Sequence, residues 1–417
     1  MEHFDTTSHP HRRCDLKRDN INGYDTVLDN PLTNIHVLVS AHRTKRPWLG
    51  QTEPTEPSNL PQYDPACYLC PGNTRAGGKV NEVYTSTMVF ENDYAAVLPP
   101  PGPVTPPAAH PLLTVEPIQG GCDVVCFHPR HDLSLPTLSL SDVENIVDEW
   151  TRVYMKRGTE PGIKYVQIFE NKGAMMGCSN PHPHSQVWSL SVVPTIPTKE
   201  LASLHNYAST THVRSGVPTG PDGHACLLCE YVHHELTVPG DEGRLVITNE
   251  HFVALVPWWA YWPFEIMVLP YKRHISSLVH LTTDEKHAFA DIMSRVTKRY
   301  DNLFSCSFAY AMGIHQRPIP PRRDVDGIFV QDADDIAHLH VHFEPPLLRS
   351  ASVRKFLAGC VSSQVVDLSM QFNIADRFEV MAEPQRDLTP EQAARKLRDC
   401  SEVHYLHTAQ QRDMESA

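Results

Sequence analysis

Residues 178–186 read CSNPHPHSQ, which sets His182 and His184 on either side of a proline and Gln186 two residues further on. An isolated His-x-His is typical of a surface turn or of core histidines, so this segment alone decides little. A second segment, HLHVH at residues 338–342, repeats the spacing later in the chain. Alternation along a strand predicts that its three histidines share one face. Such a face would be either a metal or phosphate platform or simply a solvated polar surface.

The features around the two histidine segments recur in the same order. Each begins with a Cys-x-x-Cys pair, CYLC or CLLC, and continues with strand-like runs, one long helix and another strand. Alignment by order pairs Cys67 with Cys226, Cys70 with Cys229, His131 with His274, and His182, His184 and Gln186 with His338, His340 and His342. An internal duplication of roughly 150 residues per half explains this order. Each half is then a meander of strands with one helix, which predicts an α+β fold with a mainly antiparallel sheet.

Both long helices carry sequence signals at their starts and along one face. Ser141 with Glu144, and Thr282 with Glu285, have the spacing of a capping box. Helical periodicity of apolar residues then predicts two buried stripes. The stripes comprise Val143, Ile146, Val147, Trp150 and Tyr154 in the first helix, and Phe289, Ile292, Met293, Val296 and Tyr300 in the second. These faces are expected to pack against the sheet.

Composition narrows the class of protein. The 417 residues carry a net charge of −13, whereas nucleic-acid binders usually show a basic footprint. No apolar run approaches the roughly 18 residues of a membrane span. Residues 1–20 are polar and charged, unlike a signal peptide or transit helix. We therefore expect a cytoplasmic protein without a nucleic-acid or membrane partner, in which Cys-x-x-Cys indicates metal binding more often than a disulfide.

Several segments together resemble the galactose-1-phosphate uridylyltransferase family, which belongs to the histidine-triad superfamily. The segments are HRTKRPW, CYLCPGN, FENDYAAV, FENKGAMMGCSNPHPHSQVW, WPFEIMVLP, LHVHFEPPLLRSASVRKF and EPQRDLTPEQAA, and the resemblance runs from about residue 20 to 400. It implies two tandem triad-like halves, at residues 21–197 and 198–400, between flexible tails at 1–20 and 401–417. It also implies a homodimer in which each subunit contributes to the other's active site.

The resemblance implies a reaction and a catalytic residue. UDP-glucose and galactose 1-phosphate would give glucose 1-phosphate and UDP-galactose by a ping-pong mechanism through a covalent uridylyl-histidine. His184 matches the family nucleophile, and neutral imidazole needs no partner base at pH 7 because its pKa is about 6.5. Gln186, on the same face of an extended segment, is expected to donate to a phosphoryl oxygen as charge builds.

The resemblance also implies two metal sites. Cys67, Cys70, His131 and His182 match a four-ligand zinc set, which has no open position and is therefore structural; the alternative is a group of buried, reduced cysteines. Glu200, His315, His340 and His342 match a second set, whose nitrogen and oxygen ligands suit iron or zinc. The duplicated frame adds a hypothesis of this chain's own, a third metal site at Cys226, Cys229, His274 and His338; the alternative is four ordinary core residues.

Substrate-binding residues are carried over by motif. They are Arg43, Arg46, Ala76, Asn92, Asp93, Asn171, Gly177, Ser179, Gln186, Lys355, Phe356, Phe378, Glu379 and Gln385. The chain departs from the family pattern at residues 360–377, which intervene between RKF and the segment containing Glu379. We interpret this segment as an intron retained in the coding sequence; a surface insertion is the alternative, because long loops are tolerated at small entropic cost.

Two other functions compete with uridylyl transfer. A dinucleoside-polyphosphate phosphorylase or hydrolase of the same superfamily would share the histidine nucleophile, but Gln186 and the cysteine zinc set favour the transferase. A zinc-stabilised nucleic-acid-binding module would explain the two Cys-x-x-Cys pairs. The acidic charge balance argues against it.

Overall fold

The computed structural model describes residues 25–34, 36–40, 60–100, 110, 112–113, 116–240, 242–320, 333–346, 385–386 and 388–407. Its main element is a nine-stranded sheet in the order β3-β4-β6-β5-β10-β11-β9-β8-β7. The strands are β3 Met88–Glu91, β4 Gly120–Cys126, β5 Tyr165–Lys172, β6 His184–Leu190, β7 Leu245–Thr248, β8 Phe252–Leu255, β9 Ile266–Pro270, β10 Tyr310–His315 and β11 His340–Glu344. Every neighbouring pair is antiparallel, so the predicted α+β class with an antiparallel sheet is confirmed.

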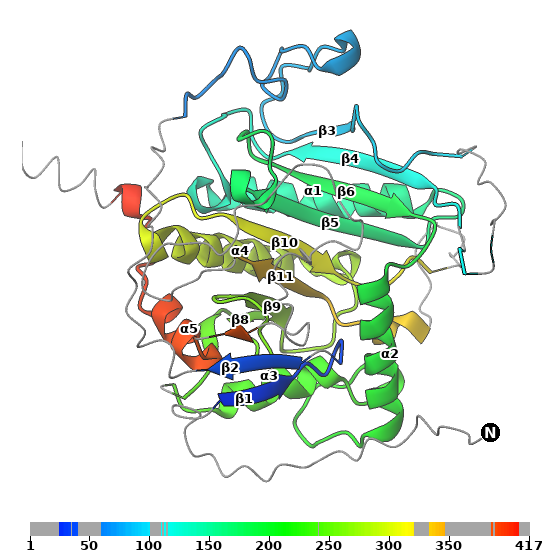
Figure 1. The fold of residues 1–417 in the computed structure, drawn as a ribbon, viewed down its shortest axis with the longest axis vertical. Helices are drawn as coiled ribbons and strands as arrows, with labels where there is room; N and C mark the ends of the chain where they lie inside the picture. Colours follow the sequence, from blue (N-terminus) through cyan, green and yellow to red (C-terminus); the bar gives the residue numbers. More distant parts are fainter. Residues whose placement is uncertain are drawn as a thin grey trace, which may run out of the picture.

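Eight of the nine strands are arranged symmetrically about the junction of β5 and β10. Moving outward from that pair, β6 corresponds to β11, β4 to β9 and β3 to β8, while β7 at the edge has no counterpart among the described strands of the sheet (Figure 1). The register agrees, because Phe169 lies opposite Gln186 and Gly313 lies opposite His342. Phe169 and Gly313 also face each other across the central pair. The two halves inferred from the sequence are therefore joined edge to edge into one sheet.

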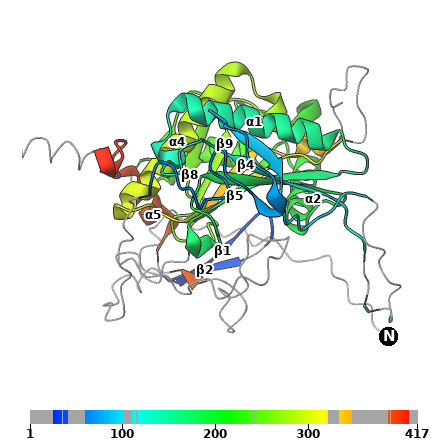
Figure 2. The ribbon, with the colours of Figure 1, turned by 90° about the horizontal axis from the view of Figure 1, so that it is seen from above.

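The helices divide between the two sides of this sheet. They are α1 Leu140–Gly158, α2 Thr195–Thr210, α3 Leu227–Thr237, α4 Thr283–Phe304 and α5 Pro390–Arg398. The single-turn 3-10 helices are η2 Ala76–Gly78, η3 Leu135–Thr137, η4 Ala174–Met176, η5 Pro221–Gly223, η6 Leu278–His280 and η7 Ala333–Ile336. A small sheet of β1 Asp25–Asp29, β2 His36–Ser40 and β12 Gln385–Arg386 lies on the side opposite α1 and α4 (Figure 2).

The predicted apolar stripes of the two long helices form the core. All ten of their side chains are fully buried and belong to one cluster with the facing strand residues. On β6, Ser185 points to this side, and its hydroxyl accepts a hydrogen bond of 2.8 Å from Nε1 of Trp150 in α1. Because side chains alternate along a strand, His184 and Gln186 point to the other side. The helices thus cover one face of the sheet and leave the histidines on the opposite face.

The capping predictions had different outcomes. Thr282 and Glu285 form the capping box expected for α4. For α1 the predicted start at Ser141 is wrong, because the N-cap is Ser139, whose hydroxyl accepts from the amide of Asp142. The segment offers two serines two residues apart, and use of the earlier one lengthens the helix by two residues, so that it begins at Leu140.

The expected boundary between residues 197 and 198 falls inside α2, which connects the halves. Of the tail expected at residues 401–417, the structure describes residues 401–407, which lie against α4. There His404 is 2% exposed, with Nε2 3.2 Å from a carboxylate oxygen of Asp301. Among the helices that the structure describes, none combines the length and apolar character needed to cross a membrane.

Candidate functional site

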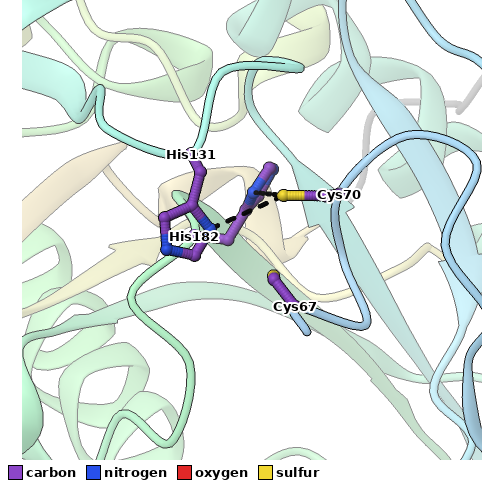
Figure 3. A group of neighbouring side chains, drawn as sticks. All are labelled: Cys67, Cys70, His131 and His182. Atoms are coloured by element: carbon purple, nitrogen blue, oxygen red, sulfur yellow. Dashed lines mark hydrogen bonds between the residues drawn. The ribbon is translucent and has the colours of Figure 1, made fainter. Parts of the chain in front are cut away.

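The four predicted zinc ligands of the first half come together. We call Cys67, Cys70, His131 and His182 the first-half cysteine cluster; its side chains come from three separate loops and are at most 5% exposed (Figure 3). Sγ of Cys70 lies 3.6 Å from Nδ1 of His131 and 3.5 Å from Nδ1 of His182. Tetrahedral zinc, with bonds of about 2.3 Å to sulfur and about 2.0 Å to nitrogen, sets those atoms about 3.5 Å apart. The residues therefore fit a structural zinc ion.

Neighbouring polar groups hold the ring of His182 in the neutral tautomer that a metal ligand needs. Its Nε2 lies 2.9 Å from the hydroxyl of Tyr84, which itself donates to the carbonyl of Leu69. The hydroxyl has one proton, so Nε2 must be the donor and Nδ1 keeps its lone pair toward Cys70. Burial lowers the pKa of His182 to about 3, with a smaller contribution from the charge of His131. The imidazole is therefore neutral at pH 7.

Asn180 links this cluster to the start of β6. Its side-chain oxygen accepts from the backbone amide of His182 at 3.0 Å, and its Nδ2 donates to Sγ of Cys67 at 3.5 Å. Asn180 is 4% exposed. One side chain thus holds a ligand from each of two loops, which restricts how the chain enters the strand.

His184 is the first residue of β6 and is oriented by the same segment. Its Nδ1 lies 2.8 Å from the carbonyl oxygen of His182. A carbonyl only accepts, so Nδ1 carries the proton and Nε2 keeps the lone pair. Burial lowers the pKa of His184 from its usual value, which favours the neutral ring. A neutral imidazole with a fixed tautomer is suited to nucleophilic attack through Nε2.

Gln186 follows on the same face of β6. Its side-chain oxygen accepts a hydrogen bond of 3.1 Å from Nε1 of Trp188. Indole nitrogen only donates, which settles the orientation of the amide and leaves its NH₂ group able to donate. The site therefore offers a nucleophile at His184 and a hydrogen-bond donor at Gln186, two residues away.

The other predicted substrate contacts are distributed around this face. Asn171 is on β5, paired with Ala311. Gly177 ends η4 with φ of 78°, a left-handed conformation that glycine adopts readily, and Ser179 is exposed in the loop before His182. Their role as substrate contacts stays a prediction.

A second group of predicted substrate contacts lies before and after β3 in the chain. Ala76 begins η2, and the side-chain oxygen of Asn92 caps the amide of Tyr94 at 2.9 Å. Both carboxylate oxygens of Asp93 accept from Arg75 at 3.3 Å, so this carboxylate is held in place. Sequence reasoning did not find Arg75, although it is one residue before Ala76.

Seven predicted contacts are not tested by side-chain positions. Arg43, Arg46, Lys355, Phe356, Phe378 and Glu379 lie outside the described residues, as does the whole 360–377 segment. Gln385 is in β12, and its backbone pairs with Leu38 of β2.

Glu200, His315, His340 and His342, here the carboxylate–histidine cluster, also come together. Nδ1 of His315 lies 2.8 Å from Glu200. Burial is the largest single influence on Glu200 and raises the pKa of its carboxyl, but the charges and hydrogen bonds of His315 and His340 together lower that pKa below its usual value. Nε2 of His340 and Nδ1 of His342 are buried without a hydrogen-bond partner in the part of the chain that the structure describes. The nearest carboxylates are beyond hydrogen-bond distance: Nε2 of His340 is 3.8 Å from Glu200, and Nδ1 of His342 is 3.9 Å from Glu265. Two nitrogens without a hydrogen bond beside a carboxylate fit a metal ion of nitrogen and oxygen preference.

The prediction that all three histidines of HLHVH share one platform is wrong. β11 begins only at His340, so the alternation does not extend back to His338. His338 instead lies 3.2 Å from Sγ of Cys226 through its Nδ1. The hypothesised grouping of Cys226, Cys229, His274 and His338 is found, with ligand atoms all within 4.8 Å of one another.

These observations first define a class, a duplicated α+β protein in which a histidine next to a potential zinc site has the tautomer needed for nucleophilic attack. The chain belongs to the galactose-1-phosphate uridyl transferase family, whose N-terminal domain model matches residues 18–194 and whose C-terminal domain model matches residues 200–362.

Similar proteins agree with this assignment. The chain is 43% identical over 401 residues to a galactose-1-phosphate uridylyltransferase of Cryptococcus neoformans var. neoformans serotype D, covering 94% of this chain and 95% of the relative. It is 45% identical over 388 residues to that of Rattus norvegicus, covering 93% and 90%. A solved uridylyltransferase structure superposes with a TM-score of 0.62 at 25% identity, covering 93% of this chain and 99% of that one.

Proposed function

We propose that this protein is a UDP-glucose–hexose-1-phosphate uridylyltransferase, which converts UDP-glucose and galactose 1-phosphate into glucose 1-phosphate and UDP-galactose. The observation that carries the proposal is the 2.8 Å contact between Nδ1 of His184 and the carbonyl of His182. It fixes the proton on Nδ1 and so reserves Nε2 for phosphorus. The relatives named galactose-1-phosphate uridylyltransferase support the choice of substrates.

The reaction proceeds in two displacements. Nε2 of His184 attacks the α-phosphorus of UDP-glucose, a nitrogen–phosphorus bond forms, and the bond to the bridging oxygen breaks. Its electron pair leaves with glucose 1-phosphate. A phosphate oxygen of galactose 1-phosphate then attacks the same phosphorus, and the electron pair of the nitrogen–phosphorus bond returns to Nε2. Nδ1 keeps its proton throughout, and the carbonyl of His182 stabilises the positive charge of the uridylylated ring.

Gln186 and its neighbours provide the surroundings for these steps. The NH₂ group of Gln186 donates to a non-bridging phosphoryl oxygen as negative charge develops. Asn171, Gly177 and Ser179 line the phosphate approach, while Ala76, Asn92 and Asp93 contact the uracil and ribose. Arg43, Arg46, Lys355, Phe356, Phe378, Glu379 and Gln385 complete the nucleotide and sugar-phosphate contacts.

Metals in this proposal are structural. Zinc in the first-half cysteine cluster would be held by two thiolates and two imidazoles, and would brace the loop that leads to His184. The carboxylate–histidine cluster would hold iron or zinc. Neither metal takes part in a displacement, because Nε2 of His184 is the reacting atom.

We further infer a cytoplasmic homodimer in which each chain completes the partner's site, with no nucleic-acid partner. The family resemblance supports the dimer, and the net charge of −13 disfavours polyanion binding. Light scattering after gel filtration tests the assembly. A chain that stays monomeric while fully active would contradict the shared site.

Isotope exchange tests the proposed function. Wild-type protein with UDP-glucose and labelled glucose 1-phosphate, without galactose 1-phosphate, is expected to produce labelled UDP-glucose, because the first displacement is reversible and independent of the second. With galactose 1-phosphate added, UDP-galactose should form. If UDP-galactose forms while exchange requires galactose 1-phosphate, transfer is direct and the histidine intermediate is wrong. If neither reaction occurs in folded protein, the proposed function is wrong.

A further inference from the structure

The second half contains a group of four potential metal ligands that uridylyl transfer does not use. We call Cys226, Cys229, His274 and His338 the second-half cysteine cluster. Sγ of Cys226 lies 3.2 Å and Sγ of Cys229 lies 3.5 Å from Nδ1 of His338. Both values are close to the separation of about 3.5 Å between sulfur and nitrogen on one tetrahedral zinc ion. The cysteines are 2% and 1% exposed, respectively, and neither is in a disulfide.

Hydrogen bonds to the two histidines leave one ring nitrogen of each without a proton. Nε2 of His338 lies 3.2 Å from the carbonyl of Pro270, and Nε2 of His274 lies 2.8 Å from the carbonyl of Asp335. Carbonyls only accept, so both Nε2 atoms are donors. In the neutral form of each ring, Nδ1 therefore holds the lone pair. This second-shell pattern is the one that orients metal-bound histidines.

Among the described residues, one of these nitrogens lacks a hydrogen-bond partner. Nδ1 of His274 is buried and makes no hydrogen bond within the described ranges. Buried polar atoms are nearly always satisfied, and an exception calls for an explanation such as an unseen ion. A divalent cation bound to Nδ1 of His274 would be such an ion. Two thiolates would neutralise the charge of that cation in the apolar surroundings of Leu228 and Val232.

We propose that the second-half cysteine cluster binds a third metal ion, a thiophilic divalent cation such as Zn²⁺. Two thiolates and two imidazoles leave no open position, so the site is structural. Its role follows from its position in the chain. The carbonyl of His338 lies 2.6 Å from Nδ1 of His340 and accepts a hydrogen bond from it. The third ion holds His338 and thereby aims Nε2 of His340 into the carboxylate–histidine cluster.

Cobalt substitution tests the proposal on the wild-type protein. Cobalt bound by thiolates absorbs through charge transfer, whereas cobalt in the carboxylate–histidine cluster, which has no sulfur ligand, does not. We expect two thiolate-bound cobalt ions per wild-type chain. The double variants Cys67→Ser/Cys70→Ser and Cys226→Ser/Cys229→Ser should each retain one. Cys306→Ser, which changes a buried cysteine outside every cluster, should retain both.

A single thiolate-bound cobalt in the wild type, lost in Cys67→Ser/Cys70→Ser and kept in Cys226→Ser/Cys229→Ser, would overturn the proposal. Should the variants fail to fold, the wild-type count alone decides between one ion and two.

A second readout tests the orientation of His340. Cys226→Ser/Cys229→Ser should weaken binding of the metal in the carboxylate–histidine cluster by about 10- to 100-fold. Unchanged affinity there would refute the proposed coupling.

Discussion

The two halves of the molecule use the same backbone for different chemistry. In the first half, β5 and β6 present Asn171, His184 and Gln186 on the face of the sheet opposite α1 and α4. At the matching register of β10 and β11 stand His315, His340 and His342. In both halves Nδ1 of the histidine at the strand start donates a hydrogen bond to the carbonyl two residues earlier, at 2.8 Å for His184 and 2.6 Å for His340.

The difference lies in the neighbours. An asparagine and a glutamine flank His184, and both can donate hydrogen bonds to a phosphate without binding a metal strongly. Two histidines flank His340, and Glu200 from α2 adds a carboxylate. The two halves thus differ by histidines in place of the asparagine and the glutamine, and by the added carboxylate of Glu200. With these changes the position of a nucleophile becomes that of a metal ligand. The same tautomer serves both, because each task needs an unprotonated Nε2.

The largest expected effect comes from removing the nucleophile. His184→Ala should lower kcat by at least about 10³-fold, the scale seen when a covalent nucleophile is lost. Metal content and thermal stability should stay near wild type, since His184 belongs to no metal cluster. Steady-state kinetics with metal analysis on the same samples measure both.

The matched control is His340→Ala. It should lose the metal of the carboxylate–histidine cluster while keeping the exchange reaction. If His340→Ala abolished exchange in metal-loaded protein and His184→Ala did not, the roles of the two halves would be reversed.

Exchanging the flanking residues sharpens the comparison. Gln186→His should lower kcat by about 10²-fold, because a donor to the developing charge is lost. The reciprocal His342→Gln should release metal from the carboxylate–histidine cluster with a smaller effect on kcat. Equal losses of activity and metal in both variants would show that the halves are not specialised in this way.

Removing a hydrogen bond to a ligand of the first-half cysteine cluster should have an intermediate effect on zinc affinity. Tyr84→Phe removes the hydroxyl that fixes the tautomer of His182, so zinc affinity should fall by about 10- to 100-fold. Competition with a coloured chelator measures this. Tyr63→Phe, whose hydroxyl contacts Asn73 outside the cluster, is the control. Equal zinc affinity in the two variants would argue against the hydrogen bond as the orienting contact.

The smallest effects are expected at the helix starts. Ser139→Ala and Thr282→Ala should each lower the free energy of unfolding by about 1 kcal/mol, the usual contribution of an N-cap. Ser141→Ala should change it by less than about 0.5 kcal/mol, because Ser141 lies inside α1. Urea unfolding of the three variants measures this order. A larger loss in Ser141→Ala than in Ser139→Ala would contradict the cap assignment.

The sequence was sufficient where a pattern is local or repeated. Apolar periodicity located the buried faces of α1 and α4, the family resemblance grouped the first two metal-ligand sets, and the duplication grouped the third. The sequence failed where packing selects between similar options. Ser139 and Ser141 are both suitable N-cap residues, and the helix uses the earlier one. His338 does not share a face with His340 and His342 because β11 starts two residues later. Tyr84 and Asn180 were missed because each acts through a loop distant in sequence.

The measurement that tests the central claim most directly is the intact mass of the protein after mixing with UDP-glucose alone. The account predicts a gain of one uridylyl group per active chain, lost on adding galactose 1-phosphate and absent in His184→Ala. An unmodified mass in folded, metal-loaded protein that still forms UDP-galactose would contradict it, as would an adduct that persists in His184→Ala.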